Sequence, residues 1–308
     1  MSEKAVGNLL AFLAMVLWAT QFPGMAEVME TWHPILMTPF RLSASAIFLL
    51  FLLIVTGGAH HVRHANWRDV WILGGVVLTI STMLFIWGQK YAHPVTAAVI
   101  ISLMPVISAL LDIVQKRAQV TLPIAVGIAL AVAGGFITTL EPGKGGLAFG
   151  LMGGEFFLLA AVILFVVYSR ETTIRLAGIS ELAQSAFTLA AGAIGAAIVA
   201  AAAVLVGFAE PVYDFSPKSV GIIAWVGAMA VGAAMAMWFA AARRLGVTIT
   251  SMHHNLVPFY VILFSVAGGG AILQNQAWGA VLVFSGAVLA QLPIAAWLKG
   301  RQRQRGTV

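Results

Sequence analysis

The chain has 308 residues, of which 61% are hydrophobic and only 9% are charged, and its mean hydropathy is +0.97. An ordinary soluble domain carries about 25% charged residues, so this composition excludes a soluble protein and predicts an all-α membrane protein. The net charge of +6 is spread over loops between apolar stretches, which excludes a nucleic-acid partner, and the absence of cysteine excludes disulfides and thiolate metal sites.

Ten apolar stretches are each long enough to form a membrane-spanning helix, which needs about 20 residues. In chain order they cover residues 7–28, 34–57, 69–91, 94–112, 121–140, 148–169, 181–207, 218–242, 247–268 and 276–298. The first is preceded only by Lys4 and has no small-residue cleavage site, so we interpret it as a retained span and not as a signal peptide. The loops are short and leave no room for a soluble domain.

The basic residues predict how the chain enters the membrane. With the N-terminus inside, 13 lysines and arginines fall in inner segments, against three in outer segments (Lys90, Lys144 and Lys218). Cytoplasmic loops carry an excess of lysine and arginine. We therefore expect a multi-pass protein of the bacterial inner membrane with both termini in the cytoplasm.

The two halves of the chain are similar to each other. Residues 96–111 (TAAVIISLMPVISALL) align with residues 249–264 (ITSMHHNLVPFYVILF), which places Pro105 on Pro258 and Ser102 on Asn255. Gly7 and Trp18 have the same spacing as Gly154 and Phe165, and the Gly127/Gly134 pair matches the Gly279/Gly286 pair. We therefore predict two domains of five helices each, residues 1–145 and 146–308.

Because five is odd, the second domain must cross the membrane upside down relative to the first. Pro105 and Pro258 would then both lie roughly 17 Å deep at 1.5 Å per residue, near the centre of a hydrocarbon core about 30 Å thick. Inverted repeats are typical of secondary transporters, whose substrates bind near the midplane between the repeats. The fold predicted from the sequence is therefore ten helices, arranged as two inverted five-helix repeats around a central cavity.

Several stretches resemble the EamA-type drug/metabolite transporter superfamily over essentially the whole chain. They are LWATQFPGM (17–25), HPILMTPFRLSASAIFLL (33–50), WFAAARRLGVTITSMHHNLVPFYVILF (238–264) and AWGAVLVFSGAVLA (277–290). The resemblance implies a ten-helix exporter, and within the superfamily it is greatest to the amino-acid exporters, in particular the aromatic amino-acid branch. A Gly-Glu pair that family members often carry after the fourth and ninth helices is absent, which implies a specialised branch.

Polar residues inside a span are costly and usually face the bundle interior or a wet cavity. His254 and Asn255 lie just before Pro258, whose ring prevents the hydrogen bond to the His254 carbonyl. We expect this kink to line a substrate cavity, although packing between helices is the alternative reading. His253 points about 100° away around the helix, so no metal site is predicted. Pro105 and Ser102 form the matching kink of the first half.

Only two charged residues lie clearly inside the predicted spans and away from their ends, Arg41 and Glu155. Each is seven residues from the outer end of its span, about 10 Å deep, so an ion pair between them is geometrically possible. Arg41 can hold a substrate carboxylate, and Glu155 can carry a coupling proton; a purely structural pair is the alternative. If Glu155 carries the proton, Glu155→Gln makes transport independent of pH, which uptake measured across a pH series tests.

Aromatic side chains complete the predicted site. Trp18, Trp87 and Trp238 lie within spans, and with Tyr168 and Tyr260 they can form the wall of a pocket for a flat or apolar substrate, or simply pack between helices. Gln21 and Pro23 disturb the first span as TQFPG and are further cavity candidates.

The predicted function is a secondary carrier that exports small metabolites, above all aromatic or other apolar amino acids, by alternating access. The alternatives are a multidrug or lipophilic-cation exporter of the same superfamily, or a channel. The sequence has no nucleophile–base set and no G-x-S-x-G elbow, so we do not expect an enzyme, and it has no nucleotide-binding motif, so we expect no cofactor. The expected partners are the substrate and the lipid bilayer, and the protein is expected to be a monomer.

Overall fold

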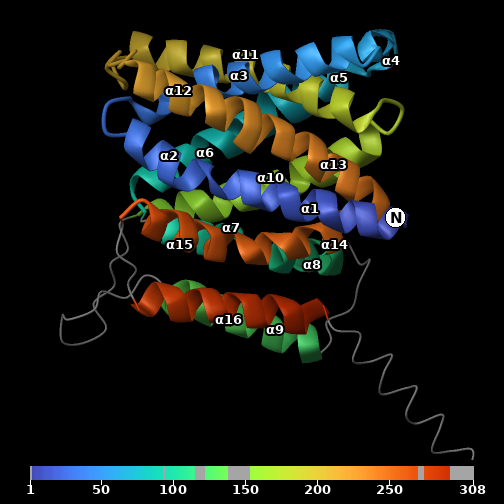
Figure 1. Ribbon diagram of the computed structural model, residues 1–308, viewed down its shortest axis with the longest axis vertical. Coiled ribbons are helices and arrows are strands. Elements are labelled where there is room, and N and C mark those ends of the chain that lie inside the picture. Colours follow the sequence, from blue (N-terminus) through green and yellow to red (C-terminus); the bar gives the residue numbers. More distant parts are fainter. Residues whose placement is uncertain (1, 93, 115–121, 138–152, 270–273, 292–308) are drawn as a thin grey trace, which may run out of the picture.

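The computed structural model describes residues 2–92, 94–114, 122–137, 153–269 and 274–291, and within these ranges every regular element is helical. Long helices lie roughly parallel or antiparallel to one another (Figure 1). Eight of them are long and apolar enough to cross a membrane. The chain is therefore an all-helical, multi-pass membrane protein, as its composition predicts.

The first half contains eleven of the described elements. They are α1 (Glu3–Ala19), α2 (Gln21–Val28), α3 (Pro34–Val55), η1 (Gly58–His60), α4 (His61–His64), α5 (Trp67–Val70), η2 (Trp71–Leu78), α6 (Thr79–Lys90), α7 (Pro94–Ile101), α8 (Met104–Val114) and α9 (Leu122–Ile137). The second half contains α10 (Gly154–Arg175), α11 (Glu181–Leu205), α12 (Pro217–Trp225), η3 (Val226–Ala233), α13 (Ala234–Leu245), α14 (Val247–Ser251), η4 (Met252–Leu256), α15 (Val257–Ala267) and α16 (Gln274–Gln291).

Each of the ten predicted spans overlaps a described helix, but parts of the spans 121–140, 148–169 and 276–298 lie outside the described residues. Two of these helices, α9 and α16, pack against each other at one edge of the molecule (Figure 1). The predicted span 148–169 was wrong in its position. The helix begins at Gly154, after Gly153 at a φ of +89°, and continues to Arg175 through a polar last turn. The boundary between the two predicted domains, at residues 145 and 146, lies outside the described residues, as do Lys144 and the basic residues 116, 117, 299, 301, 303 and 305.

Both proline-containing stretches are broken where the repeat predicts. α7 ends at Ile101, and α8 begins at Met104 immediately before Pro105. In the second half, the 3₁₀ segment η4 separates α14 from α15 and ends two residues before Pro258. Proline lacks an N–H and clashes with the carbonyl four residues earlier, so each proline sits in the first turn of a new helix.

Two π-helical segments of eight residues, η2 and η3, occupy matching places in the two halves. Each is followed by an α-helix of 12 residues, α6 or α13. Short π segments inside α-helices are rare and are frequent at functional sites. Their composition is that of any apolar span, so these segments could not be predicted from the sequence.

Glycines let these π segments pack closely on neighbouring helices. Gly74 of η2 faces the Thr188 backbone of α11, and a Cβ at Gly74 would lie 2.7 Å from the Thr188 Cα atom. Gly227 of η3 faces α3, where Ser45 Oγ donates to the Gly227 carbonyl at 2.7 Å. Small residues allow such close backbone approach between membrane helices, where packing rather than water exclusion holds helices together.

Ion pairs and one hydrogen bond identify which helix ends lie together. We call the end of the bundle where α1 begins the Glu3 end. There, Arg244 at the end of α13 pairs with Glu3, and Arg243 pairs with Glu181 of α11. Arg175 at the end of α10 pairs with Asp69 at the same end. At the Glu27 end, Lys218 of α12 pairs with Glu27, and Trp32 Nε1 donates to the Asp214 carbonyl at 2.7 Å. Hydrogen bonds from Ser219 and Ser216 lower the pKa of the Asp214 carboxyl in this loop. Consequently α1 begins, and α10 ends, at the Glu3 end.

The close contact at Gly74 can be tested by substitution. Gly74→Ala inserts a Cβ against the Thr188 backbone, and such overpacking costs about 1–3 kcal/mol. Gly221→Ala in α12 is the matched control, because a Cβ there meets no atom within 4 Å. We expect Gly74→Ala alone to lower the melting temperature of the purified protein in detergent. Equal melting temperatures for both variants would contradict the packing.

Candidate substrate cavity

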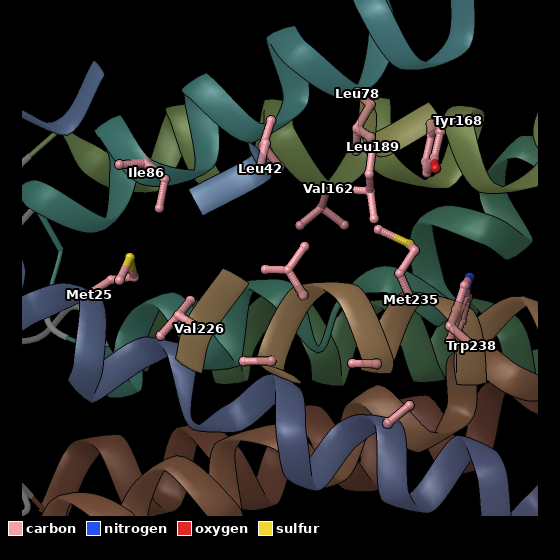
Figure 2. Packing of buried hydrophobic residues seen from close by; sticks show 14 of the residues in the cluster. Met25, Leu42, Leu78, Ile86, Val162, Tyr168, Leu189, Val226, Met235 and Trp238 are labelled. Atoms are coloured by element: carbon pink, nitrogen blue, oxygen red, sulfur yellow. The ribbon is translucent and has the colours of Figure 1, made fainter. Parts of the chain in front are cut away.

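A cavity lies between the two halves of the chain, with about 600 Å³ of space not occupied by atoms, including its open part. Figure 2 shows some of its walls: Val162 of α10, Leu189 of α11 and Met235 of α13 point toward one another across the bundle. Among the described residues, the lining is Trp18, Gln21, Phe22, Arg41, Leu42, Leu78, Ser81, Thr82, Phe85, Ile101, Met104, Ala161, Val162, Phe165, Leu189, Val231, Met235 and His254.

Arg41 is the charged residue of this lining. Its side chain, on α3, is 2% exposed, and its Nη1 atom donates to Gln21 Oε1 at 2.9 Å. The guanidinium carbon lies 6.0 Å from the centre of the Phe85 ring. The buried Nε atom has no hydrogen-bond partner among the described residues, and no carboxylate lines the cavity. A buried guanidinium with unused donors is suited to bind an anion such as a carboxylate.

An aromatic wall adjoins this cation. Trp18 of α1 contacts Phe165 of α10 and His254 of η4, with ring centres 5.2 Å apart in both pairs and edge-to-face geometry. Trp238 of α13 lies behind them, 4.8 Å from the His254 ring and 6.2 Å from Trp18. Aromatic rings prefer this geometry, and their faces provide flat apolar surface. The cavity therefore combines one cation with a mostly apolar, aromatic surface.

Four of the predicted site residues line the cavity: Trp18, Gln21, Arg41 and His254. They come from α1, α2, α3 and η4, so the structure brings together residues up to 236 positions apart in the sequence. Pro23, in the first turn of α2, follows the lining residue Phe22 and is partly buried. The disturbed first span thus contributes to the cavity through Gln21 and Phe22.

Other predicted residues support the wall from behind. Trp238 and Tyr168 are fully buried and do not belong to the lining. The Trp238 Nε1 atom donates to Ser169 Oγ at 2.8 Å, and the Tyr168 hydroxyl lies 2.7 Å from Thr188 Oγ1. Buried Trp and Tyr usually require such partners, so these bonds fix the two rings.

The two residues of the matched kinks are also buried outside the lining. Ser102 donates to the Val99 carbonyl at 2.7 Å, while its neighbours Ile101 and Met104 reach the cavity. Asn255 is 2% exposed and follows the lining residue His254. The buried Pro105 and Pro258 contribute by ending the preceding helices beside the cavity.

Three predicted residues lie elsewhere. Trp87 contacts His33, Tyr91 and Phe208 near the Glu27 end, and Tyr260 contacts Phe12. Glu155 is in the first turn of α10, where its carboxylate accepts the Gly153 N–H at 3.1 Å. Its predicted position seven residues inside the span was wrong, because the helix starts at Gly154. Arg41 interacts with Gln21, and no ion pair to Glu155 is found within the described part of the chain.

The sequence did not single out most of the lining. Ser81 and Thr82 of α6 are polar residues in a span, a signal that could have been used; Ser81 Oγ donates to the Ala161 carbonyl at 2.9 Å. The apolar residues, such as Leu42, Leu189 and Met235, carry no such signal. An apolar side chain that faces a cavity has the same sequence pattern as one that faces lipid.

Comparisons with known proteins give a consistent result. Residues 5–140 match the EamA-like transporter family. The "Uncharacterized transporter YyaM" of Bacillus subtilis is 24% identical over 80% of both chains. The "Probable terminal-alkyne amino-acid exporter" of Streptantibioticus cattleyicolor is 24% identical over 99% of this chain and 98% of its own. A solved crystal structure of a protein aligns with a TM-score of 0.70 and 22% identity, over 93% of this chain and 96% of that one, which shows a shared fold.

The absence of native cysteine makes the cavity testable by labelling. Thr82 lines the cavity, whereas Thr79, one turn earlier, is packed with its hydroxyl 3.2 Å from the Gly192 carbonyl. We expect a small methanethiosulfonate reagent to modify Thr82→Cys much faster than Thr79→Cys in the folded protein. Equal modification rates would mean that water does not enter between these helices.

Proposed function

We propose that the chain, whose residues 5–140 match the EamA-like transporter family, is a secondary carrier of the EamA-type drug/metabolite transporter superfamily that exports small carboxylate metabolites, above all aromatic or other apolar amino acids. The observation that carries the proposal is the buried Arg41 guanidinium, with a donor that lacks a partner, in a cavity that an aromatic wall lines. The relative whose name specifies an amino-acid exporter supports the same substrate class.

The charge of the cavity argues against the alternative of a lipophilic-cation exporter. A cationic substrate would need an anionic partner in a low-dielectric site, and none of the described lining residues is a carboxylate. Arg41 would in addition repel such a substrate, because like charges at short range in a buried site disfavour each other. A carboxylate instead compensates the cost of keeping the Arg41 charge inside the membrane.

We further propose that the two halves, residues 1–145 and 146–308, are inverted repeats of five helices each. Three observations support this. The helices that match in sequence, α1 and α10, run in opposite directions. The matched glycines pack alike, Gly7 against the end of α13 and Gly154 against the end of α6. The matched residues Trp18 and Phe165 contact each other at the cavity, as residues beside a twofold axis do.

This symmetry supports alternating access. Transport would proceed by rocking of the two units around a fixed substrate site. Two ion pairs at the Glu3 end, Arg244–Glu3 and Arg175–Asp69, and the Lys218–Glu27 pair at the Glu27 end join helices of different units, so each set would open when the cavity opens to that side. We propose that the Glu3 end, with Arg175, Arg243 and Arg244, faces the cytoplasm of a bacterial cell, that both chain termini lie there, and that the protein works as a monomer.

Substrate exchange in proteoliposomes tests the carrier. Purified protein should give saturable, trans-stimulated flux of labelled L-phenylalanine, and phenethylamine, which lacks the carboxylate, should not compete. Arg41→Gln removes charge-assisted hydrogen bonds that contribute about 1.5–3 kcal/mol, so we expect a loss of roughly 10- to 100-fold in apparent affinity. Arg41→Lys should retain part of the apparent affinity for L-phenylalanine.

Arg63→Gln is the matched control, because Arg63 is exposed in α4, away from the cavity. The Arg63→Gln variant should have the wild-type apparent affinity for L-phenylalanine. Flux that does not saturate or show trans-stimulation would indicate a channel. Unchanged affinity in Arg41→Gln, or competition by phenethylamine, would contradict the carboxylate site.

A further inference from the structure

His254 contributes an imidazole to the described cavity lining, and histidine is the side chain whose unperturbed pKa lies near neutral pH. Its side chain is 1% exposed and lies between two tryptophans, with ring centres 5.2 Å from Trp18 and 4.8 Å from Trp238. It belongs to η4, the short 3₁₀ segment at the break before Pro258. Packing alone does not require a titratable group here, and the proposed carrier leaves its source of energy open.

The charged and titratable groups near His254 are few. Its own element holds His253, and of the elements that pack on η4, α15 holds Tyr260 beside Phe12 and α8 holds Asp112, whereas α14 and α16 hold no charged residue. On α1 and α13, Glu3, Arg243 and Arg244 are engaged in ion pairs at the far Glu3 end, where Lys4 also lies. Arg41 and His254 line the same cavity. Within the described lining, therefore, a charge on His254 is sensed by the bound substrate and by Arg41.

An amino acid brings two charges into this cavity. Arg41 accounts for the carboxylate, but the lining offers no carboxylate for the ammonium group. The acceptors that remain are the Gln21 carbonyl, the hydroxyls of Ser81 and Thr82, and the imidazole of His254 when it is neutral. An imidazole that has bound a proton presents only N–H donors and a positive charge, so it cannot accept from an ammonium group.

We propose that His254 binds either a proton or the ammonium group of the substrate, and thereby couples amino-acid export to proton entry. This inference rests on the proposed function and names the coupling ion of the same site. Release of a substrate to the outside leaves a neutral imidazole, which takes up one proton there. That proton returns with the empty carrier and leaves to the cytoplasm when the next substrate binds. Because a zwitterion carries no net charge, each cycle moves one positive charge inward.

The competition predicts a specific pH dependence. Only the carrier with neutral His254 binds substrate, so the apparent dissociation constant equals the intrinsic one divided by the neutral fraction. Below the pKa of His254, the affinity for L-phenylalanine should fall about tenfold per pH unit. We consider proteoliposomes in which the cytoplasmic face of the protein faces the lumen. An inward proton gradient, or a membrane potential negative inside, should accelerate export of L-phenylalanine from them.

His254→Gln keeps an acceptor, the amide oxygen, but cannot take up a proton. We expect this variant to exchange L-phenylalanine across the membrane while its affinity stays constant between pH 5.5 and 8 and a proton gradient no longer drives export. His253→Gln is the matched control at the neighbouring position, and Glu155→Gln, outside the cavity lining, is a second control. Both should keep the wild-type pH dependence.

The outcomes separate the two proposals. If wild-type protein exchanges L-phenylalanine but its affinity is independent of pH, or if His254→Gln keeps the pH dependence, the coupling role is wrong and the carrier stands. If Glu155→Gln alone abolishes the pH dependence, the coupling site is Glu155 and not His254. If affinity rises as the pH falls, proton and substrate bind together, which overturns the competition. Absence of any saturable flux overturns both proposals.

Discussion

A positive charge buried within the membrane-spanning region is the constraint on which this structure depends. Placing arginine in the centre of a spanning helix costs about 3 kcal/mol on insertion scales. Arg41 meets this cost through one hydrogen bond to Gln21 and the face of Phe85, and its Nε atom has no hydrogen-bond partner among the described residues. An arrangement built only for stability would supply a carboxylate to the guanidinium. The incomplete set of partners supports the proposal that an anionic substrate binds here.

The surrounding helices are built so that this charge stays accessible from a cavity. The backbone of α3 at Arg41 and Ser45 packs against Gly227 of η3, where a side chain would clash. On the other side, Gly74 and Gly195 hold η2 against α11. Close contacts along these pairs fix the outer layers of the bundle and leave the space between α1, α6, α10 and α13 open. Small residues therefore determine where the helices pack closely and where a cavity remains between them.

The two breaks at Pro105 and Pro258 bring irregular backbone to the same region. Irregular backbone at membrane depth is tolerated where it is buried in protein or lines a cavity. The segment η4 uses its break to place His254 between Trp18 and Trp238, next to the aromatic wall that suits an apolar substrate. In the proposed mechanism, a fixed cation binds the carboxylate, while a titratable neighbour responds to the substrate's second charge. The carrier then needs neither nucleotide nor metal to store energy, because one proton replaces one substrate.

The sequence by itself determined the membrane class, the eight apolar helices of spanning length in the described residues, the two proline breaks and four lining residues, Trp18, Gln21, Arg41 and His254. These follow from local chemistry: apolar length, a missing N–H, and polar groups where lipid excludes them. Only the tertiary structure decided which polar residues meet. Glu155 caps the start of α10 because the helix begins six residues later than its apolar stretch, and Trp238 and Tyr168 stand behind the wall because Ser169 and Thr188 hold them there. The apolar residues of the lining could not be predicted, because the same side chains face the lipid, the protein core and the cavity.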